Sequence, residues 1–175
     1  MKGAALVWVL LFIVGCGGVQ QVKPPVTAFN FDPVVVRAPK PGQNLNFYDA
    51  KEVFNRGRLA RSFEQYEDCI RFFGMVIDEF PTSKYAHPAL YNRGLCYESH
   101  DNAHAAAKDF ETFSERADDA ESRLDGLFRL LHNLVEIDHN SKALQLTQKL
   151  LSLKLAKLDQ AEVLAKQGHV LHRLG

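Results

Sequence analysis

Histidine, cysteine and carboxylate side chains could carry chemistry in this chain, and one group of them is regularly spaced. Cys96, His100 and His104 recur at every fourth position, which would align three possible metal ligands on a continuous helix. The turn-forming pair Asp101-Asn102 lies between the two histidines and interrupts such a helix. Because no further ligands follow at the spacing of a zinc site, the sequence predicts no metal ion and no other cofactor.

A second group, Asp118, Asp119 and Glu121, could supply paired carboxylates, but a solvated turn explains it more simply. The sequence has no nucleophile elbow, zinc-protease motif, P-loop or dinucleotide-binding loop. We therefore expect neither an enzyme nor a small-molecule substrate. Basic and acidic residues number 21 each, and this balance gives no electrostatic reason to expect nucleic acid as a partner.

Cys16 follows a segment with the properties of an export signal. Lys2 is the only charge before an apolar run from Ala4 to Val14, and Gly15 separates this run from the cysteine. The run is shorter than the roughly 20 residues that a membrane-spanning helix needs. An uncleaved anchor, or an ordinary signal with an incidental cysteine, is the alternative to a modified thiol.

The residues Ile13-Val14-Gly15-Cys16 resemble the lipobox of bacterial lipoproteins. The resemblance implies that residues 1–15 are a signal peptide, and that Cys16 becomes a lipidated N-terminus with acyl chains such as palmitate. Each buried methylene contributes about 0.8 kcal/mol, so two or three chains anchor a protein stably. In this family an aspartate after the cysteine favours retention in the inner membrane. Gly17 stands there instead, which implies sorting to the periplasmic face of the outer membrane.

Residues 16–46 are predicted to form an extended tether, because five of the seven prolines fall in this stretch. The apolar patch from Phe29 to Val36 departs from this pattern, since a solvated linker seldom carries so many apolar residues. Three roles for the patch stay open: docking on the following domain, docking on a partner, and forming a short added strand.

The remainder, residues 47–175, is predicted to be a helical domain. Two pairs have the spacing of a helix-capping box, Asp49 with Glu52 and Asp159 with Glu162. Helix ends or turns are predicted at Phe80-Pro81-Thr82, Asp101-Asn102 and His139-Asn140-Ser141, and a helix start at His87-Pro88.

Two further cysteines, Cys69 and Cys96, lie in this domain. An oxidising compartment would allow a disulfide between them, but both also suit a plain apolar core. Spacing alone does not bring two cysteines together, so we expect core residues and leave their redox state open.

Residue types in the domain recur every 37 positions. A repeat of this length with helical spacing inside it predicts stacked helical hairpins, each burying its apolar face on its neighbours. We expect small residues where helices cross closely, Gly57 against Cys69 and Gly94 against Ala106. Positions that keep the step of 37 include Val53, Leu90, Leu127 and Leu164, with glycines at Gly57, Gly94 and, two steps later, Gly168.

The repeats resemble tetratricopeptide repeats (TPRs). The second repeat matches best, and in the third Leu131 replaces the glycine and Thr147 the aromatic residue. The residues that carry the match are Leu90, Gly94, Tyr97, Ala106 and Phe110. The resemblance implies an all-α, right-handed TPR solenoid of antiparallel helical hairpins, about three and a half repeats long, after an extended N-terminal tether. It is closest to bacterial TPR lipoproteins and related periplasmic TPR proteins.

In TPR folds the first helices of the hairpins line a concave groove, which suits an extended peptide or a partner helix. Registering the sequence on that pattern gives an aromatic row of Phe54, Tyr91 and Phe128. The two flanking rows are Arg58, Leu95, His132 and His169, and Arg61, Glu98, Val135 and His172. Packing between hairpins is the alternative role of the aromatic row.

The stretch from Ala161 to Leu174 repeats the first-helix pattern. Its apolar residues are predicted to have no second helix to cover them: Val163, Leu164, Val170, Leu171 and Leu174. We expect it to pack on residues 143–155, with its outer face covered by another subunit, a partner or further sequence. A simple cap, and a chain that is a fragment of a longer protein, stay open.

The expected function is a membrane-anchored periplasmic scaffold in an envelope assembly complex, most like outer-membrane β-barrel assembly. The alternatives are a pilotin, a motility or secretion component, and a regulator of peptidoglycan or cell-division enzymes. Expected partners are other envelope proteins, with the membrane contacted through the lipid. The sequence determines neither the partner complex nor the oligomeric state.

Overall fold

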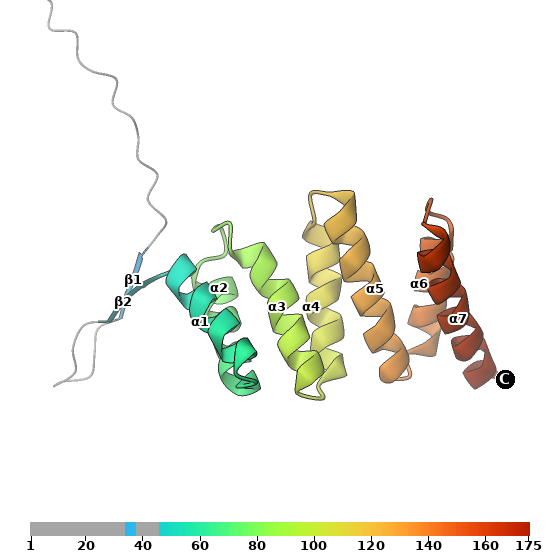
Figure 1. The fold of residues 1–175 in the computed structure, drawn as a ribbon, viewed down its shortest axis with the longest axis horizontal. Helices are drawn as coiled ribbons and strands as arrows, with labels where there is room; N and C mark the ends of the chain where they lie inside the picture. Colours follow the sequence, from blue (N-terminus) through green and yellow to red (C-terminus); the bar gives the residue numbers. More distant parts are fainter. Residues whose placement is uncertain (1–33, 38–45) are drawn as a thin grey trace, which may run out of the picture. The chain divides into compact units, whose positions relative to one another are not determined.

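The computed structural model describes residues 34–37 and 46–175 (Figure 1). Within these residues, a pair of strands precedes seven helices. They are β1 (Val34–Arg37), β2 (Asn46–Asp49), α1 (Ala50–Ser62), α2 (Tyr66–Glu79), α3 (Ala86–Ser99), α4 (Ala103–Arg116), α5 (Ala120–Glu136), α6 (Asn140–Leu151) and α7 (Lys157–Leu174). The predicted signal peptide, Cys16, Gly17 and most of the predicted tether lie outside the described residues.

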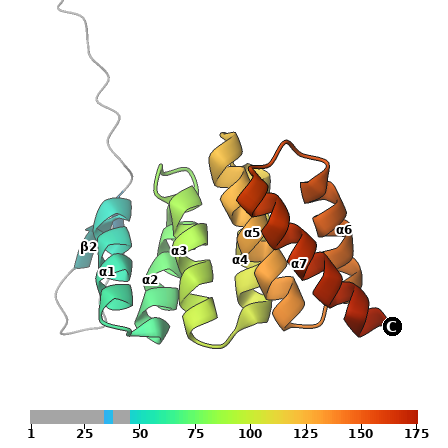
Figure 2. The ribbon, with the colours of Figure 1, turned by 45° about the vertical axis from the view of Figure 1, so that its right-hand side comes forward.

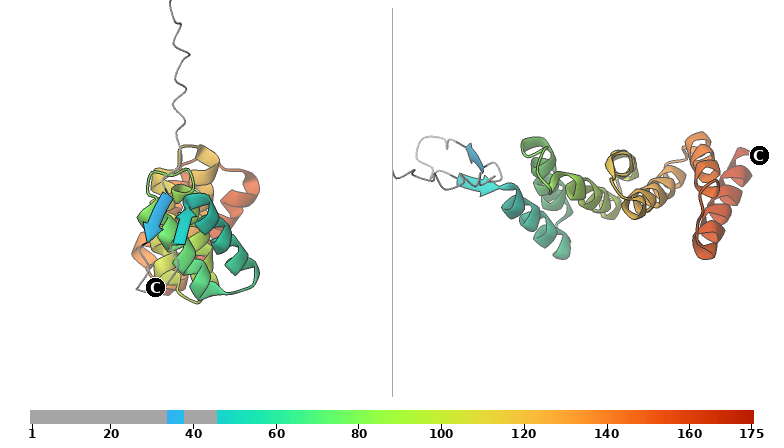
Figure 3. Two further views of the ribbon diagram at one scale, coloured as in Figure 1. Left: turned by 90° about the vertical axis from the view of Figure 1, so that its left-hand side faces the viewer. Right: turned by 90° about the horizontal axis from the view of Figure 1, so that it is seen from above.

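Consecutive helices pack against each other in chain order. α1 pairs with α2, α3 with α4 and α5 with α6, and α7 packs on α6. α2 also contacts α3 and α4 contacts α5, so each hairpin is joined to the next (Figures 1 and 3). The prediction of an all-α domain is confirmed. None of the described helices combines the length and the hydropathy required to cross a lipid bilayer.

The first helix of each hairpin ends in the same backbone turn. Glu64, Asp101 and Asp138, each 37 residues after the last, have φ angles of 58°, 54° and 55°. The N–H of the following residue donates to a carbonyl five positions earlier, at 2.9 Å in all three turns. This left-handed helix ending satisfies carbonyls that would otherwise lack a partner. The 37-residue repeat of the sequence is therefore also a repeat of backbone conformation.

Helix starts agree with the predicted caps at one site and differ at two. Asp49 caps α1, because its Oδ1 accepts the Glu52 N–H at 2.7 Å. The cap predicted at Asp159 is wrong, since α7 begins at Lys157 and Asp159 lies in its first turn. A carboxylate there interacts favourably with the helix dipole instead. The turn predicted to include Asn140 is also displaced, because α6 begins at that residue.

The two strands pair antiparallel, with Val34 opposite Asp49. Val35 packs on the core beside α1. Tyr48 is buried, and its hydroxyl donates to Glu79 at 2.6 Å. Of the three roles left open for the apolar patch, its described end thus forms a short strand. Residues 47–49, which we assigned to the helical domain, belong to the second strand.

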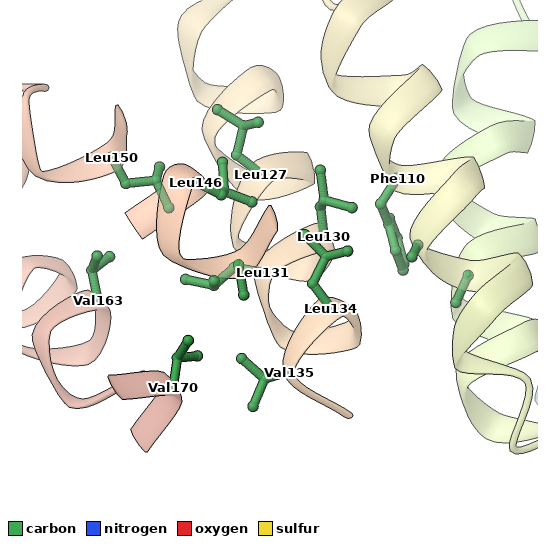
Figure 4. Packing of buried hydrophobic residues seen from close by; sticks show 13 residues of the cluster. Phe110, Leu127, Leu130, Leu131, Leu134, Val135, Leu146, Leu150, Val163 and Val170 are labelled. Carbon is green, nitrogen blue, oxygen red and sulfur yellow. The ribbon is translucent and has the colours of Figure 1, made fainter. Parts of the chain in front are cut away.

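Buried apolar side chains form two clusters, one around α1 to α3 and one from α4 to α7. In the second cluster Val163 lies beside Leu150, and Val170 lies beside Val135 (Figure 4). Both valines of α7 are fully buried in this cluster, so they do not belong to the uncovered apolar side that was predicted for this helix. The side of α7 that carries these two valines packs on the preceding hairpin, in agreement with the prediction that this helix packs on residues 143–155.

Phenylalanine rings lie on the glycines at the helix crossings. A Cβ on Gly57 would be 2.9 Å from the Phe73 ring, and one on Gly94 would be 2.8 Å from the Phe110 ring. The partners predicted for these glycines, Cys69 and Ala106, are therefore not the closest ones. The absent Cβ makes room for an aromatic ring one helical turn further along the second helix.

Candidate partner-binding face

Polar side chains bridge each of the first helices, α1, α3, α5 and α7, to the next first helix along the chain; Figure 2 shows where these four helices lie. We call the surface that they share the first-helix face. The bridges are Arg61 donating to Asn92 at 3.0 Å, Asn133 donating to Glu98 at 2.6 Å, Lys166 within 3.3 Å of His132, and Arg173 donating to the Val135 carbonyl at 2.9 Å. These contacts span 31 to 38 residues of sequence, so they hold different hairpins in register.

The predicted aromatic row is half-buried. Phe54 packs edge-on against Phe73, and Tyr91 against Phe110, with ring centroids 5.3 and 5.5 Å apart. Phe128 packs on the second core cluster. Each ring therefore helps to close its own part of the core, as the packing alternative requires, and keeps an exposed part on the first-helix face.

Tyr91 has distinctive electrostatic surroundings. Burial, followed by the nearby Asp125 carboxylate, raises the pKa of its phenol, while Arg129 acts in the opposite direction. Burial alone would lower the pKa of Arg129, but Tyr91 and Glu98 outweigh that effect and raise it. At neutral pH the face therefore presents a protonated phenol beside a charged guanidinium, and both are hydrogen-bond donors.

The two flanking rows contain exposed side chains as well as side chains that pack or form ion pairs within the domain. Leu95 is half-buried and Val135 is buried, so both belong to the packing of the domain. Glu98 is half-buried and bound to Arg129 at 3.1 Å, which makes it a positioning residue rather than a free carboxylate. The exposed members are Arg58, Arg61, His132, His169 and His172, all cationic or histidine side chains.

Two open hollows lie on the first-helix face. The first measures about 390 Å³, and its lining includes Arg58 and Arg61. The second measures about 540 Å³ and extends to the turn between α3 and α4; its lining includes three carboxylates and two histidines, Glu98, Asp101, Glu136, His104 and His132. Open, polar hollows of this kind suit the side chains of a peptide better than an enclosed small ligand.

The buried ion pair of Arg93 and Asp109 was not predicted from the sequence. Arg93 of α3 donates two hydrogen bonds to the carboxylate of Asp109 in α4, at 2.8 and 2.7 Å. Burial would lower the pKa of Arg93, but the bonds to Asp109 outweigh it and raise that pKa. The sequence did contain a sign of this pair, because the charged residue Asp109 stands next to Phe110, a repeat position that is buried.

The side chains considered for metal binding point to different neighbours. His100 lies against Tyr66, with ring centroids 6.5 Å apart, and His104 lies against His139, at 5.6 Å. Cys96 is buried and oxidised. Among the described residues, no group of three or more histidine, cysteine or acidic side chains is placed to hold a metal ion.

The acidic cluster at the start of α5 has a structural role. Asp119 accepts the backbone N–H of Ser122 at 2.7 Å, which caps the helix and lowers the pKa of the Asp119 carboxyl. Asp118 and Glu121 are exposed beside it. The cluster is therefore a helix cap in an exposed turn.

Cys69 and Cys96 form a disulfide that links α2 to α3, with Cα atoms 6.2 Å apart. Both cysteines are fully buried, as expected for core residues, and the redox state that the sequence left open is the bridged one. The pairing follows from the packing of one hairpin on the next, which the sequence separation of 27 does not reveal.

Comparisons with known proteins do not supply a relative. No protein-family model matches the sequence, and no curated protein matches it. The function must therefore be inferred from the residues and contacts of the chain itself.

Proposed function

We propose that this protein is a lipid-anchored scaffold of the bacterial envelope, which holds partner proteins on its first-helix face. Its helical domain is a right-handed TPR solenoid of about three and a half repeats, carried on a tether that begins at Cys16 and leads to the strand pair β1–β2. Cys16 is the lipid attachment site, and Gly17 directs the protein to the outer membrane. The protein assembles other proteins and does not catalyse a reaction.

The TPR assignment is supported by the repeat of both sequence and backbone. The left-handed turn residues keep the same step of 37 as the glycines. The glycine of each of the first two repeats receives a phenylalanine ring from the second helix of its own hairpin. The glycine and the phenylalanine are two of the positions on which the resemblance to TPRs rests.

The disulfide supports export to an oxidising compartment. Disulfides persist outside the cytosol and are rare within it. Cys69 and Cys96 are both fully buried, and they join two hairpins. A periplasmic domain behind a lipidated Cys16 accounts for all three cysteines of the sequence.

The observation that carries the binding proposal is the set of exposed side chains along the first-helix face. Arg58 and Arg61 line one hollow and His132 lines the other, with His169 and His172 beyond them on α7. The exposed arginines and histidines, with half-buried aromatic rings between them, suit an acidic segment of a partner, either extended or helical, whereas the carboxylates Glu98, Asp101 and Glu136 of the second hollow suit donor groups of that partner. Assembly of outer-membrane β-barrel proteins is the pathway that the resemblance favours.

The anchor is tested by Cys16→Ala, which removes the acylated thiol. We expect signal cleavage at this site to fail and the lipidated membrane form to disappear, whereas wild-type protein carries acyl mass on Cys16. Mass spectrometry of the N-terminus checks both outcomes. An unmodified Cys16, or cleavage at another site, would contradict the lipoprotein assignment.

The binding face is tested by co-purification from detergent-solubilised outer membranes. Arg58→Glu with Arg61→Glu should deplete the partners that wild-type protein retains. Arg71→Glu is the matched control, because Arg71 is an exposed arginine on α2. Recovery of β-barrel assembly proteins supports the leading pathway, and a secretin or murein enzymes would name another. Equal recovery by the double variant and the control would refute the first-helix face as the binding surface.

A further inference from the structure

Four leucines line a small pocket between α4, α5 and α6, which we call the leucine pocket. They are Leu127, Leu130 and Leu134 of α5 and Leu146 of α6, and the pocket measures about 190 Å³. Figure 4 shows where these leucines lie in the second core cluster. Ordinary ligand sites measure about 300–1,000 Å³, whereas an apolar cavity of about 150 Å³ holds one benzene molecule. The leucine pocket therefore has room for a single apolar side chain rather than for a whole small-molecule ligand.

Short side chains leave this pocket at a place that an arginine fills one repeat earlier. There Arg93 of α3 is paired with Asp109 of α4, and its guanidinium lies 3.5 Å from a Cβ built on Gly74 of α2. The positions of Arg93 and Asp109 are taken by Leu130 and Leu146 in the third hairpin. Leucine is shorter than arginine, so the space between these two leucines and α4 is not filled from within the hairpin.

The rim of the leucine pocket carries unpaired charges of both signs. Lys142 of α6 and Glu111 of α4 are paired with each other at 2.7 Å. Glu115 of α4 and Lys149 of α6 also line the pocket and are exposed. Within the described part of the chain, neither of them forms an ion pair. An apolar side chain that enters between a cation and a carboxylate of its own would therefore complement this rim.

The end of α1 presents an apolar side chain of this kind. Phe63 is 67% exposed, and it is the one exposed ring among the phenylalanines whose burial the structure describes. Leu59, one turn earlier on the same side of the helix, is 58% exposed. Arg61 and Glu64 flank the ring, and neither forms an ion pair with another described residue. We call these four residues the α1 tip.

We infer that the α1 tip of one copy of this chain docks in the leucine pocket of a second copy, with the Phe63 ring on the four leucines. Glu64 then lies beside Lys149 of the second copy, and Arg61 beside its Glu115. Two copies that exchange tips form a closed dimer, whereas one contact per pair continues as a row or a ring. The inference rests neither on the lipid anchor nor on the partners of the first-helix face, although Arg61 belongs to both surfaces.

Sedimentation velocity of the purified full-length protein, in excess detergent and over a range of protein concentrations, tests the contact. The mass of the wild type should rise reversibly with concentration. Phe63→Ala should weaken this association at least tenfold, because it removes the side chain that fills the pocket. Leu158→Ala is the control, because Leu158 is 81% exposed on α7 and lies outside both surfaces. A monomeric wild type, or a Phe63→Ala variant that associates as tightly as the wild type, would overturn the inference.

An exchange of charges tests the orientation of the two copies. Glu64→Lys and Lys149→Glu should each weaken association, because each places like charges across the contact. The protein that carries both substitutions should recover most of the wild-type association. Both residues are exposed, so the thermal midpoints of the monomers should stay close to that of the wild type. A double variant no better than the single ones would refute this pairing of tip and pocket.

Two exposed glutamines locate the contact directly. Gln65 follows the α1 tip, and Gln145 lines the leucine pocket. A bis-maleimide reagent should cross-link Gln65→Cys protein to Gln145→Cys protein in a mixture of the two, with wild type as the blank. A cross-link in either variant alone, or none in the mixture, would contradict the docking of tip in pocket. Since neither glutamine lies in the first-helix face, these results are independent of partner capture there.

Discussion

The hairpins α3–α4 and α5–α6 differ at one pair of equivalent positions. The first helix has the small residue and the second helix the large one in α3–α4, and the reverse holds in α5–α6. In the first, Gly94 of α3 receives the ring of Phe110 from α4. At the equivalent positions, 37 residues on, α5 carries Leu131 and α6 carries Thr147, both fully buried. The large residue has moved from the second helix to the first. At this pair of positions the third repeat therefore has its large residue on the first helix, where its sequence departs from the TPR pattern.

A second pair of positions differs in chemistry between the same hairpins. The buried ion pair of Arg93 and Asp109 has Leu130 and Leu146 as its equivalents, and both leucines belong to the second core cluster. At this place the second hairpin thus has a charged pair and the third an apolar pair.

The size exchange can be tested by copying the third hairpin into the second. Phe110→Thr alone should cost about 3–5 kcal/mol of unfolding free energy, because it leaves a cavity over Gly94. Gly94→Leu alone should cost about 1–3 kcal/mol, because the buried ring blocks the new side chain. The double variant should be clearly more stable than the sum of these losses predicts. Urea unfolding of all four proteins measures the coupling, and simple additivity would show that the two contacts are not equivalent.

The repeat could be predicted from the sequence because its causes are local. Apolar spacing and the helix-ending turns recur along the chain, as at Asp101 and Asp138. The partner across each contact could not be predicted, because the step of 37 fixes positions along a helix but not the rotation of one helix on another. Gly94 was therefore assigned to Ala106, one turn away from the Phe110 ring that covers it.

The candidate face was predictable to a similar degree. Registering the repeats identified Arg58 and His132 as members of its flanking rows, and both are exposed. The pairing of Glu98 with Arg129 and Asn133 was not predictable, because these bonds join side chains of different hairpins. The redox state of Cys69 and Cys96 stayed open for the same reason, since their disulfide also depends on how one hairpin packs on the next.

Removing the disulfide should cause the next largest loss of unfolding free energy. Replacing Cys69 and Cys96 together by alanine should cost about 3–4 kcal/mol, the loop-closure value for a separation of 27 residues. Reductant should lower the thermal midpoint of the wild type and leave that of the double variant unchanged. Ala143 and Val170 are the equivalent positions between α6 and α7. Ala143→Cys with Val170→Cys should therefore form a cross-link, visible as a mass loss of two hydrogens, and its absence would argue against equivalent packing of α7.

Breaking the ion pair of Arg93 and Asp109 should cost less unfolding free energy, and replacing both residues together should restore most of it. Asp109→Leu leaves the largely buried Arg93 without its partner, at a cost of about 2–3 kcal/mol. Arg93→Leu with Asp109→Leu copies the third hairpin and should return within about 1 kcal/mol of the wild type. Chemical unfolding at neutral pH measures both. A double variant as unstable as the single one would mean that the second hairpin requires the charges.

The smallest expected effect is a change in thermal midpoint on replacing Gly94 or Gly168 by alanine. The two glycines occupy the same repeat position, but the change should have opposite signs. Alanine has a helix propensity about 1 kcal/mol better than glycine, so both Gly94→Ala and Gly168→Ala begin with the same gain. At Gly94 the new methyl group would lie 2.8 Å from the buried Phe110 ring, and overpacking should exceed the gain and lower the thermal midpoint. At Gly168 no described atom is within 4 Å, so the gain should remain and the midpoint should rise by a few degrees. Differential scanning calorimetry at two protein concentrations checks both signs. A concentration-dependent loss of stability in Gly168→Ala would mean that the glycine is already covered in solution, and that α7 is closed by self-association rather than open to a partner.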